Sequence, residues 1–487
     1  SDICDQLRGG KPMNYAEALA YIYGLSDFER GGKFRNDREQ HLLREGRLLA
    51  ELDNPHHAYS CTLIAGTKGK GSTCACVESV LRAAGVRTGL YTQPDLHTFR
   101  ERMRVRGRLI SEEEMAHLLP EVRAAAERIE QEHIFNPFIP YEVMTALALL
   151  YFKRQAVQHA VLEVGIGGRL DATNVTQPLV AGIASISFDH MNVLGHTLTE
   201  IATEKAGIIK PGGVVVTSAQ APEALLAIAR VAQERQARLI RVGSVAGDPA
   251  QAEVEAGRLP ALSYRYQPVT QSTERQTFTI FTPQHSYKDL ELPLVGQHQL
   301  ENATLALAIL SELRASGRPE CSWDEAALRQ GLRDVRWSAR LEIIARHPTT
   351  IVDGAHNADS MQKLVSTLHE LFRFKRLFVV FGANADKDLA GMITALKDVE
   401  HVILTRALNP RSALFERMQE LFAQHAPHVK VSTATESREA MDLARTLAEN
   451  DDLICATGSL YLAAEVLRWA ASRGEARVAA SIEGVDH

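Results

Sequence analysis

The residues with the clearest chemical potential form a glycine-rich loop, Gly66-Thr67-Lys68-Gly69-Lys70-Gly71-Ser72. An apolar, strand-like run precedes the loop and a helical pattern follows it, so backbone N–H groups and the helix dipole favour a bound phosphate there. Lys70 can reach terminal phosphates as a point charge, and the Ser72 hydroxyl can support Mg²⁺. Ile64 stands where the usual phosphate loop has its first glycine, so a simple turn is the alternative interpretation. The flanking strand and helix weigh against that alternative.

Polar residues also end two later apolar strands. Glu163 closes the run HAVLE, and Asp189 and His190 follow the run LVAGIASIS. Ligands of open parallel sheets bind beyond the carboxyl ends of the strands. If the three strands are neighbours, Lys70, Glu163 and His190 converge, and a carboxylate with an imidazole can hold Mg²⁺ bridged to phosphates. Taken singly, Glu163 or His190 would more often be structural, so the interpretation depends on this topology.

Short apolar runs alternating with helical patterns must position these residues. Strands are expected at 58–66, 87–93, 159–165, 179–187 and 213–218, with helices at 72–85, 142–155 and 221–236. Such alternation implies parallel βαβ units, and nearly continuous apolar strands imply helices on both faces. A second series has strands at 349–357, 376–384, 401–407, 429–434 and 452–459, with helices at 358–372 and 459–472. The fold class is therefore α/β, with two domains at 1–345 and 346–487.

Residues 251–290 have a different pattern. The runs at 263–269 and 277–282 alternate polar with apolar or β-branched residues, which predicts a small antiparallel, β-rich insertion within the first domain. A helix is expected at 301–317, before the boundary between the domains.

Composition limits the class of protein. The chain has 487 residues, 45% hydrophobic and 23% charged, with a net charge of −6, which excludes a broadly basic nucleic-acid binder. No apolar run approaches the length of a membrane span, and the first dozen residues lack a signal-peptide core. The sparse cysteines form no CxxC pair and suit a reducing compartment: Cys4, Cys61, Cys74, Cys76, Cys321 and Cys455. A soluble, cytoplasmic protein is expected.

Several motifs in order resemble the folylpolyglutamate synthase/dihydrofolate synthase family of the Mur ligase superfamily. They are GTKGKGS, LEVGIGGRLDATN, DHMNVLG, EKAGIIKPG, VDGAHN, ADKD, NPR and TGSLYL, and the resemblance spans essentially residues 13–470. It implies a P-loop ATPase domain of the Mur-ligase central type, a smaller C-terminal Rossmann-like domain and an active site between them. In this family ATP phosphorylates the carboxylate of a pteroate or folate, and the amine of L-glutamate then displaces phosphate to form an amide.

The resemblance also implies roles for individual residues. Phosphate-binding positions are Gly66, Thr67, Gly69, Lys70, Gly71 and Ser72, and other nucleotide-binding positions are Asn302, Arg340 and Asp353. Metal-binding positions are Glu163, His190 and Ser72; pteroate-contacting positions are Leu170, Asp171 and Ala172; glutamate-site positions are His356 and Ser459. Lys70, Glu163, His190, Lys205 and His356 are the implied catalytic set. Lys205 matches a lysine that the family carbamylates, although a solvated helix lysine is its plain interpretation. ATP, Mg²⁺ and K⁺ are the implied cofactors.

One loop departs from the family pattern. Where Ser-Pro-His-Leu is usual, with its serine a Mg²⁺ ligand, this chain has Gln93-Pro94-Asp95-Leu96. The Gln93 carbonyl oxygen can coordinate Mg²⁺ but reaches farther than serine, and Asp95 introduces an anion. Arginines at every second position follow the loop: Arg100, Arg102, Arg104, Arg106 and Arg108. They could attract an anionic folate tail, although a solvated hairpin with a turn at Gly107 is the favoured interpretation.

Three hypotheses follow for the function. The leading one is an ATP-dependent ligase that adds L-glutamate to dihydropteroate, to a reduced folate or to both, as a monomer with no nucleic-acid or membrane partner. A second is another Mur-type amide ligase, acting on a peptidoglycan nucleotide. The third is a degenerate nucleotide-binding protein, which Gln93 and Asp95 motivate and the intact Lys70 and Glu163 oppose. Which folate reaction occurs, and how many glutamates are added, is left open.

Overall fold

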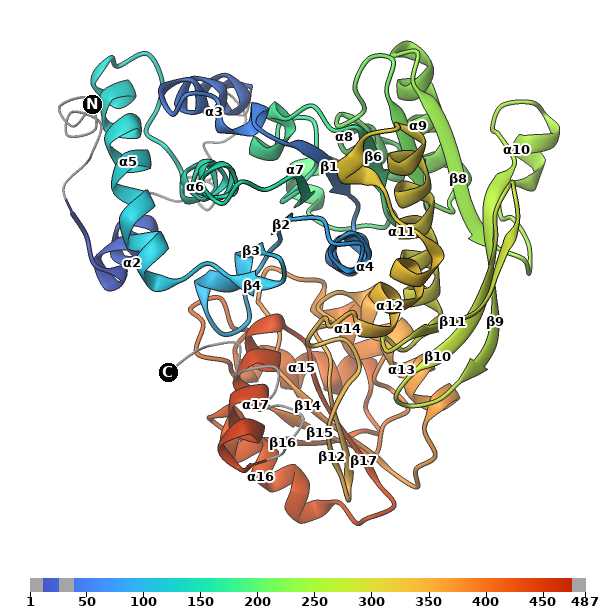
Figure 1. Ribbon diagram of the computed structural model, residues 1–487. Helices are drawn as coiled ribbons and strands as arrows, with labels where there is room; N and C mark the ends of the chain where they lie inside the picture. The colour runs from blue at the N-terminus through green and yellow to red at the C-terminus, as the bar shows by residue number, and fades with distance from the viewer. Residues whose placement is uncertain (1–11, 26–38, 475–487) are drawn as a thin grey trace.

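The computed structural model describes residues 12–25 and 39–474. They form two α/β units, one built on an eleven-stranded sheet and the other on a six-stranded sheet (Figure 1). Cys4 and most of the polar N-terminal segment lie outside the described residues. The larger sheet comes from the first two-thirds of the chain, and the smaller sheet lies below it in Figure 1. The α/β class expected from the sequence is confirmed, with a large parallel sheet and a second sheet.

The larger sheet has the order β11-β10-β9-β8-β7-β6-β1-β5-β2-β3-β4. Its strands are β1 Ser60–Ala65, β2 Thr88–Tyr91, β3 Met103–Val105, β4 Arg108–Leu109, β5 His159–Glu163, β6 Val180–Ile183, β7 Val214–Thr217, β8 Arg238–Ser244, β9 Leu262–Gln271, β10 Gln276–Phe281 and β11 Ser286–Leu292. The central strands, from β9 to β2 in this spatial order, are parallel. Strands β10 and β11 at one edge, and β3 and β4 at the other, pair antiparallel.

Residues 251–290 do not form a separate insertion. Their first segment is a helix, α10 Gln251–Glu255, and β9 then pairs in parallel with β8, so β9, β10 and β11 extend the main sheet at its edge. The antiparallel pairing expected for this region is present within β9–β11. The alternation arises because Phe278 and Ile280 point to a packed face while their neighbours along β10 are less buried.

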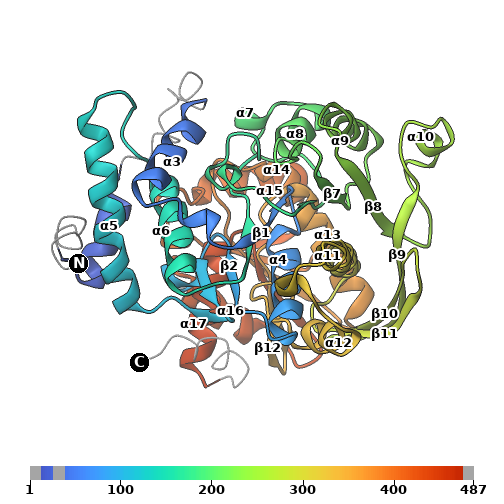
Figure 2. The same cartoon turned by 45° about the horizontal axis from the view of Figure 1, so that its top comes forward.

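Helices cover both faces of the larger sheet (Figure 2). One face packs against α4 Lys70–Ala83, α11 Gln297–Ala315 and α12 Glu325–Asp334. The other packs against α6 Pro140–Arg154, α8 Leu198–Ala206 and α9 Pro222–Glu234, with α2 Tyr15–Gly24, α3 Gln40–Glu51 and α5 Glu112–Gln131 alongside α6. In β1, Ile64 packs on the α4 face while Leu63 and Ala65 pack on the α6 face. Burial on both faces explains why this strand is apolar throughout.

The smaller sheet has the order β12-β13-β17-β14-β15-β16, and only β12 is antiparallel to its neighbour. Its strands are β12 Glu342–Arg346, β13 Thr349–Val352, β14 Leu377–Phe381, β15 His401–Leu404, β16 Lys430–Thr433 and β17 Leu453–Thr457. Helices α13 Ala358–Leu371, α14 Leu389–Thr394 and α15 Phe415–His425 cover one face, and α16 Ser437–Leu447 and α17 Leu460–Ser472 cover the other. Because β12 begins at Glu342, this sheet starts slightly before the boundary expected at 345.

The described part of the chain contains no helix with the length and apolar character of a membrane span. The cysteines at 61, 74, 76, 321 and 455 are free and buried within it.

Candidate active site

Adjacent strands bring the predicted site residues to one edge of the larger sheet. β1 pairs in parallel with β5 on one side and with β6 on the other. The loop after β1, Glu163 at the end of β5 and the residues after β6 therefore meet, as the sequence predicts if these strands are neighbours. They line a cavity of about 1850 Å³ that residues of the second sheet close from the opposite side. Every site residue expected from the sequence lines this cavity.

The glycine-rich loop is held tightly at the start of α4. Gly69 caps the helix with a φ of 82°, and a side chain there would collide with the Asn302 amide. A Cβ at Gly71 would lie 2.6 Å from the ring of Trp337, which explains why glycine rather than serine or threonine follows Lys70. The N–H groups of the first turn of α4 have no partners within the helix and are available to an anion. The local geometry is that of a phosphate-binding loop.

Two lysines converge on this loop. The Nζ atoms of Lys70 and Lys205 donate to the Gly66 carbonyl oxygen at 3.1 Å and 2.9 Å. Lys205 projects from α8 and is buried, and burial together with the nearby charge of Lys70 lowers its pKa to about 7. The solvated-lysine interpretation of Lys205 is therefore wrong. At neutral pH a substantial fraction of its amine is unprotonated.

Glu163 is the buried carboxylate of the site. Burial raises its pKa, while Lys70 and the Gln93 N–H oppose that shift. The Gln93 backbone N–H donates to Glu163 Oε2 at 3.0 Å, and the Gln93 side chain donates to the Tyr141 hydroxyl at 3.1 Å. The structure thus joins Gln93 to Glu163 through its backbone and gives its side-chain amide a protein partner.

Asp171 organises the loop that the resemblance assigns to pteroate contact. Its carboxylate is buried and accepts from the Tyr141 hydroxyl at 3.0 Å and from the N–H groups of Gly165 and Thr173, both at 3.0 Å. Leu170 and Ala172 flank it on the cavity wall. With its oxygens engaged in this way, Asp171 shapes the loop.

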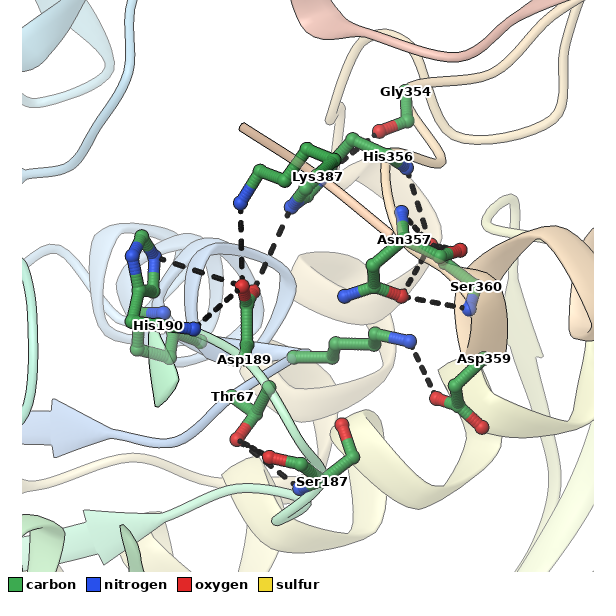
Figure 3. A network of polar contacts seen from close by, with 12 residues as sticks. Thr67, Ser187, Asp189, His190, Gly354, His356, Asn357, Asp359, Ser360 and Lys387 are labelled. Carbon is green, nitrogen blue, oxygen red and sulfur yellow. Dashed lines mark hydrogen bonds and ion pairs between the residues drawn. The ribbon is translucent and has the colours of Figure 1, made fainter. Parts of the chain in front are cut away.

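Asp189 is the centre of a polar network that crosses between the two sheets (Figure 3). Lys387, from the loop after β14, donates to Asp189 Oδ1 at 3.2 Å, and His356 Nε2 lies 4.0 Å from Oδ2. His356 Nδ1 donates to the Gly354 carbonyl at 2.9 Å, which leaves Nε2 unprotonated in the neutral ring. Burial alone would raise the pKa of Asp189, but His190, Lys387 and His356 together lower it. Asp189 is therefore an anion between the domains.

The two histidines beside Asp189 are neutral at pH 7. Partial burial in the cleft, together with the lysines around it, lowers the pKa of His190 to about 4. Burial is also the largest cause for His356, whose pKa is lowered to about 4. Neutral imidazole is the form that ligates metals and accepts protons.

Arg340 is fixed at the junction of the two sheets. The residues on both sides of it, Ala339 and Leu341, have φ values of 55° and 49°, and Asp353 Oδ2 accepts the Leu341 N–H at 2.9 Å. A Cβ at Gly354 would lie 2.8 Å from Arg340 Nη1. Asp353 thus serves as a backbone anchor that orients Arg340, and Asn302 lies against the phosphate loop on the opposite wall.

Ser459 caps a helix. Its hydroxyl accepts the Leu462 N–H at 3.1 Å at the start of α17, as an N-cap residue does. The side chain also lines the cavity. Its position is therefore at the site, and its hydroxyl is engaged.

The donor set is suited to Mg²⁺ only with a nucleotide present. The described residues contain no group of three or more His, Cys, Asp or Glu side chains that could hold a metal. Among the residues that line the cavity, Glu163, His190 and Ser72 would supply a carboxylate, a neutral imidazole and a hydroxyl. Because Mg²⁺ usually combines one or two protein ligands with phosphate oxygens and waters, this set fits a nucleotide-bound ion.

The anion introduced at Asp95 has a partner. Arg102 Nε donates to Asp95 Oδ1 at 2.5 Å, and both side chains are largely buried. Arg100 is also buried and donates to the Ile110 carbonyl at 2.7 Å. The solvated-hairpin interpretation is therefore wrong for Arg100 and Arg102. It holds for Arg106, which is exposed at the turn between β3 and β4.

Several contacts in the cavity could not be predicted from the sequence. Lys387 lies in the ADKD motif, which was visible but suggested no role. Lys68 pairs across the cleft with Asp359 at the start of α13, and Gln220 donates to Glu301. Burial raises the pKa of Glu301 to about 7. These pairs join residues far apart in the chain, which no local pattern reveals.

The domains match known families in the same order as the two sheets. Residues 64–310 match the Mur ligase middle domain, and residues 339–460 match the glutamate ligase domain of Mur ligases. With the phosphate loop, the buried carboxylate and the cleft between two sheets, this defines an ATP-dependent ligase of the Mur class.

Proteins of similar sequence and structure identify the family of Mur-class ligases to which the chain belongs. The chain is 33% identical to the dihydrofolate synthase/folylpolyglutamate synthase of Bacillus subtilis over 93% of its length and 98% of the relative's. It is 35% identical to the folylpolyglutamate synthase of Lacticaseibacillus casei, with the same coverage. The structure of Mycobacterium tuberculosis folylpolyglutamate synthase complexed with ADP superposes with a TM-score of 0.81 at 29% identity, covering 94% of this chain and 99% of that one. The chain belongs to the dihydrofolate synthase/folylpolyglutamate synthase family.

Proposed function

We propose that this protein joins L-glutamate to the carboxylate of dihydropteroate, of a reduced folate, or of both. The observation that carries the proposal is the cavity between the two sheets. There the phosphate loop and Glu163 face His356 and Lys387 of the second sheet across a network centred on Asp189. The structures of E. coli FolC in complex with DHPP and ADP, and with ADP but without folate substrate, are both 29% identical with TM-scores of 0.79 and 0.78, and they support a nucleotide and a folate as ligands.

The chemistry requires an activated carboxylate. Transfer of the ATP γ-phosphoryl group to a carboxylate oxygen gives an acyl phosphate and ADP. The glutamate amine then attacks the acyl carbon, the C–N bond forms, the C–O bond to phosphate breaks, and the nitrogen loses a proton. In this proposal Lys70, which lies beside the loop, and the N–H groups at the start of α4 neutralise phosphate charge in both steps.

Mg²⁺ would be held by Glu163, His190 and Ser72, and when bound it neutralises the charge of the phosphates. Gln93 as a further metal ligand and K⁺ as an accessory ion remain predictions from the resemblance. Arg340, Asn302 and Asp353 are assigned to the nucleotide, and Leu170 and Ala172 with the Asp171 loop to the pterin. His356 and Ser459 are assigned to the incoming glutamate.

Carbamylation of Lys205 is supported by its environment. An amine adds to CO₂ only when unprotonated, and the pKa of about 7 gives Lys205 that form at neutral pH. We expect a CO₂ adduct on Lys205 in intact protein exchanged into bicarbonate and trapped by alkylation before peptide mass analysis. An unmodified Lys205 under these conditions would contradict the assignment.

The division of labour between the two sheets is part of the proposal. Residues 1–345 carry the phosphate loop and the acceptor site, and residues 346–487 present glutamate and contribute Asp353 to the nucleotide site. A monomer located in the cytoplasm, with only small-molecule partners, is the expected form.

One assay tests the proposal. ADP release is measured with Mg-ATP and L-glutamate while dihydropteroate, tetrahydrofolate or a peptidoglycan nucleotide precursor is offered separately. We expect stimulation by at least one of the two pterin acceptors. Stimulation by the peptidoglycan precursor alone would identify a different Mur-type ligase. Release that none of the three stimulates would favour a nucleotide-binding protein without ligase activity.

A further inference from the structure

Gln93 contacts two parts of the cavity that are assigned to different substrates. Its backbone N–H donates to Glu163 Oε2 at 3.0 Å, and its side-chain amide donates to the Tyr141 hydroxyl at 3.1 Å. Glu163 lies on the phosphate side, whereas Tyr141 lines the cavity beside the Asp171 loop. One residue therefore joins the carboxylate assigned to Mg²⁺ to the wall assigned to the acceptor.

The Tyr141 hydroxyl has one proton and two acceptor positions, and all of them are used. Burial raises the pKa of this hydroxyl above its usual value, so it keeps its proton at neutral pH. The two oxygens of Asp171 already accept backbone N–H groups, from Thr173 and Gly165. Tyr141 must therefore be the donor to Asp171, at 3.0 Å. The hydroxyl then accepts from the Gly165 N–H at 3.1 Å, and the Gln93 amide fills its last position.

The same contacts hold the Tyr141 ring against the backbone. A Cβ at Gly165 would lie 2.8 Å from Tyr141 Cζ, so the hydroxyl end of the ring packs directly on the segment between Glu163 and Asp171. Aromatic rings in ligand cavities offer flat surfaces on which planar groups stack. Because this ring is held at its hydroxyl end, loss of the Gln93 amide should loosen that surface without removing it.

The loop that carries Gln93 is itself held in place. Arg102 Nε donates to Asp95 Oδ1 at 2.5 Å. The Glu101 carboxylate accepts three backbone N–H groups of the same loop, those of Leu96, His97 and Thr98. The amide of Gln93 thus has a defined position relative to Tyr141. A serine, the usual residue of the family at this position, carries its hydroxyl where Gln93 has Cγ and so lacks a donor at the position of the amide.

We propose that the Gln93 side chain is a positioning residue for the pterin acceptor and acts through Tyr141. The inference rests on the proposed ligase function and concerns a residue in which this chain departs from its family. It uses the amide nitrogen of Gln93, whereas the resemblance assigns the carbonyl oxygen to Mg²⁺. Substitution removes the side-chain contact and keeps the backbone contact with Glu163. Acceptor binding should therefore weaken while nucleotide binding stays intact.

The test removes the donor in two ways. Gln93→Met has a similar length and no polar group, and Gln93→Glu keeps a side-chain oxygen for a metal but loses the donor. We expect Gln93→Met to raise the KM for each pterin acceptor that the wild-type enzyme uses by about 3- to 10-fold, because one hydrogen bond between uncharged groups is lost. Gln93→Glu should raise it at least as much, and the Kd for ADP should stay within about 2-fold of the wild-type value in both variants. Gln251→Met, at an exposed glutamine outside the cavity, is the control.

A double-mutant cycle shows whether Gln93 acts through Tyr141. Tyr141→Phe should raise the KM for the same acceptors, and Gln93→Met/Tyr141→Phe should raise it no further than Tyr141→Phe alone. Tyr59→Phe, which removes a hydroxyl that donates to the Leu149 carbonyl outside the cavity, is the matched control. Additive increases would overturn the proposal, because Gln93 would then act by another route.

Two further measurements separate this role from metal binding and from failure of the ligase assignment. The Mg²⁺ concentration that gives half-maximal activity should not change in Gln93→Met; a shift in it with an unchanged acceptor KM would overturn the proposal in favour of a metal ligand. Calorimetric binding of dihydropteroate to the metal-free protein should weaken in Gln93→Met by about the same factor as the KM rises. If the wild-type enzyme used no pterin acceptor, the ligase assignment would fail. The calorimetric measurement would still decide the role of Gln93, because equal affinity in wild type and Gln93→Met, or no binding to either, would exclude it.

Discussion

The two walls of the reaction cleft hold their functional groups in different ways. On the wall formed by the larger sheet, Ser72, Glu163 and Lys205 are each no more than 4% exposed. Glu163 and Lys205 have partners on the same wall, the Gln93 N–H and the Gly66 carbonyl. On the opposite wall, the His356 side chain is 34% exposed and reaches across the cleft toward Asp189. Lys387 crosses in the same way at 3.2 Å.

This difference suggests that the two steps of the reaction depend on different walls of the cleft. A buried group with partners in its own sheet is preorganised before substrates bind, which is what charge stabilisation of a phosphate requires. A group that finds its partner across the cleft is positioned only when the two sheets are correctly seated. The first wall should therefore determine whether phosphoryl transfer occurs, and the second wall should determine whether glutamate is placed to use its product.

The largest effect is expected on the first wall. Lys70→Ala removes the cation beside the phosphate loop and should lower the rate of ADP formation by about 10²- to 10³-fold, because a preorganised charge at the transferring group is lost. Rapid-quench measurement of ADP in the presence of acceptor checks this. Lys153→Ala, which breaks an exposed pair with Asp53 outside the cavity, is the matched control. If Lys70→Ala turned over at the wild-type rate, the assignment of this loop to phosphoryl transfer would be wrong.

A change on the second wall should leave nucleotide binding intact. Lys387→Met removes the cation that bonds to the largely buried Asp189, and a hydrogen bond to a charged group is worth roughly 1.5–3 kcal/mol. We expect kcat/KM for L-glutamate to fall by about 10- to 100-fold while the Kd for ADP stays unchanged. Lys375→Met, which breaks an exposed pair with Asp451 in the same domain, is the control. Loss of ADP binding in Lys387→Met would erase the distinction between the walls.

The sequence predicted the first wall far better than the second. The phosphate loop and Glu163 follow strands whose apolar runs are continuous because both faces are buried, and such runs predict parallel strands whose ends meet. Lys387 and Asp189 are 198 residues apart on different sheets, and only the packing of the domains brings them together. The partner of Asp95 was also missed, because Arg102 ends a 3-10 turn, Phe99–Arg102, whose burial the alternating arginine pattern does not show.

The edge of the larger sheet formed by β9, β10 and β11 was predicted only in part. Alternation identified β10 as a strand with one buried face, but it does not identify the neighbouring strand. The parallel pairing of β9 with β8 depends on α10 and the loop that returns the chain to the sheet edge. Local pattern therefore predicted the element and left its place in the sheet undetermined.

Burial of Lys205 on the first wall should lower stability. Its pKa falls from 10.5 unfolded to about 7 folded, so the unfolded chain binds the extra proton between these values. Stability therefore rises with pH across this window, and the full cost of burying the charge is present below pH 7. Lys205→Met should raise the free energy of unfolding by about 1–3 kcal/mol at pH 7, with a smaller gain at pH 9.

Urea unfolding of Lys205→Met at the two pH values, with ligase activity measured in parallel, checks this prediction. We expect greater stability together with lost turnover. The matched variant is Lys153→Met, whose lysine forms a solvent-accessible pair with Asp53 at 3.0 Å and should not gain stability when replaced. A destabilised Lys205→Met would mean that its contact with the Gly66 carbonyl outweighs the cost of burial.

The smallest effect is expected where the walls are joined by an exposed pair. Lys68, on the first wall, bonds to Asp359 on the second, and the Asp359 side chain is 40% exposed. Pairs in contact with solvent contribute about 0.2–1 kcal/mol, so Lys68→Met should raise the KM for ATP only about 2- to 5-fold, and added salt should reproduce much of that change in the wild-type enzyme. The deeper burial of Asp189 than of Asp359 would then explain why loss of Lys387 lowers activity more than loss of Lys68, although both pairs cross the cleft. If Lys68→Met lowered activity as much as Lys387→Met, this conclusion would be reversed. The relative position of the two sheets would then depend equally on both ion pairs.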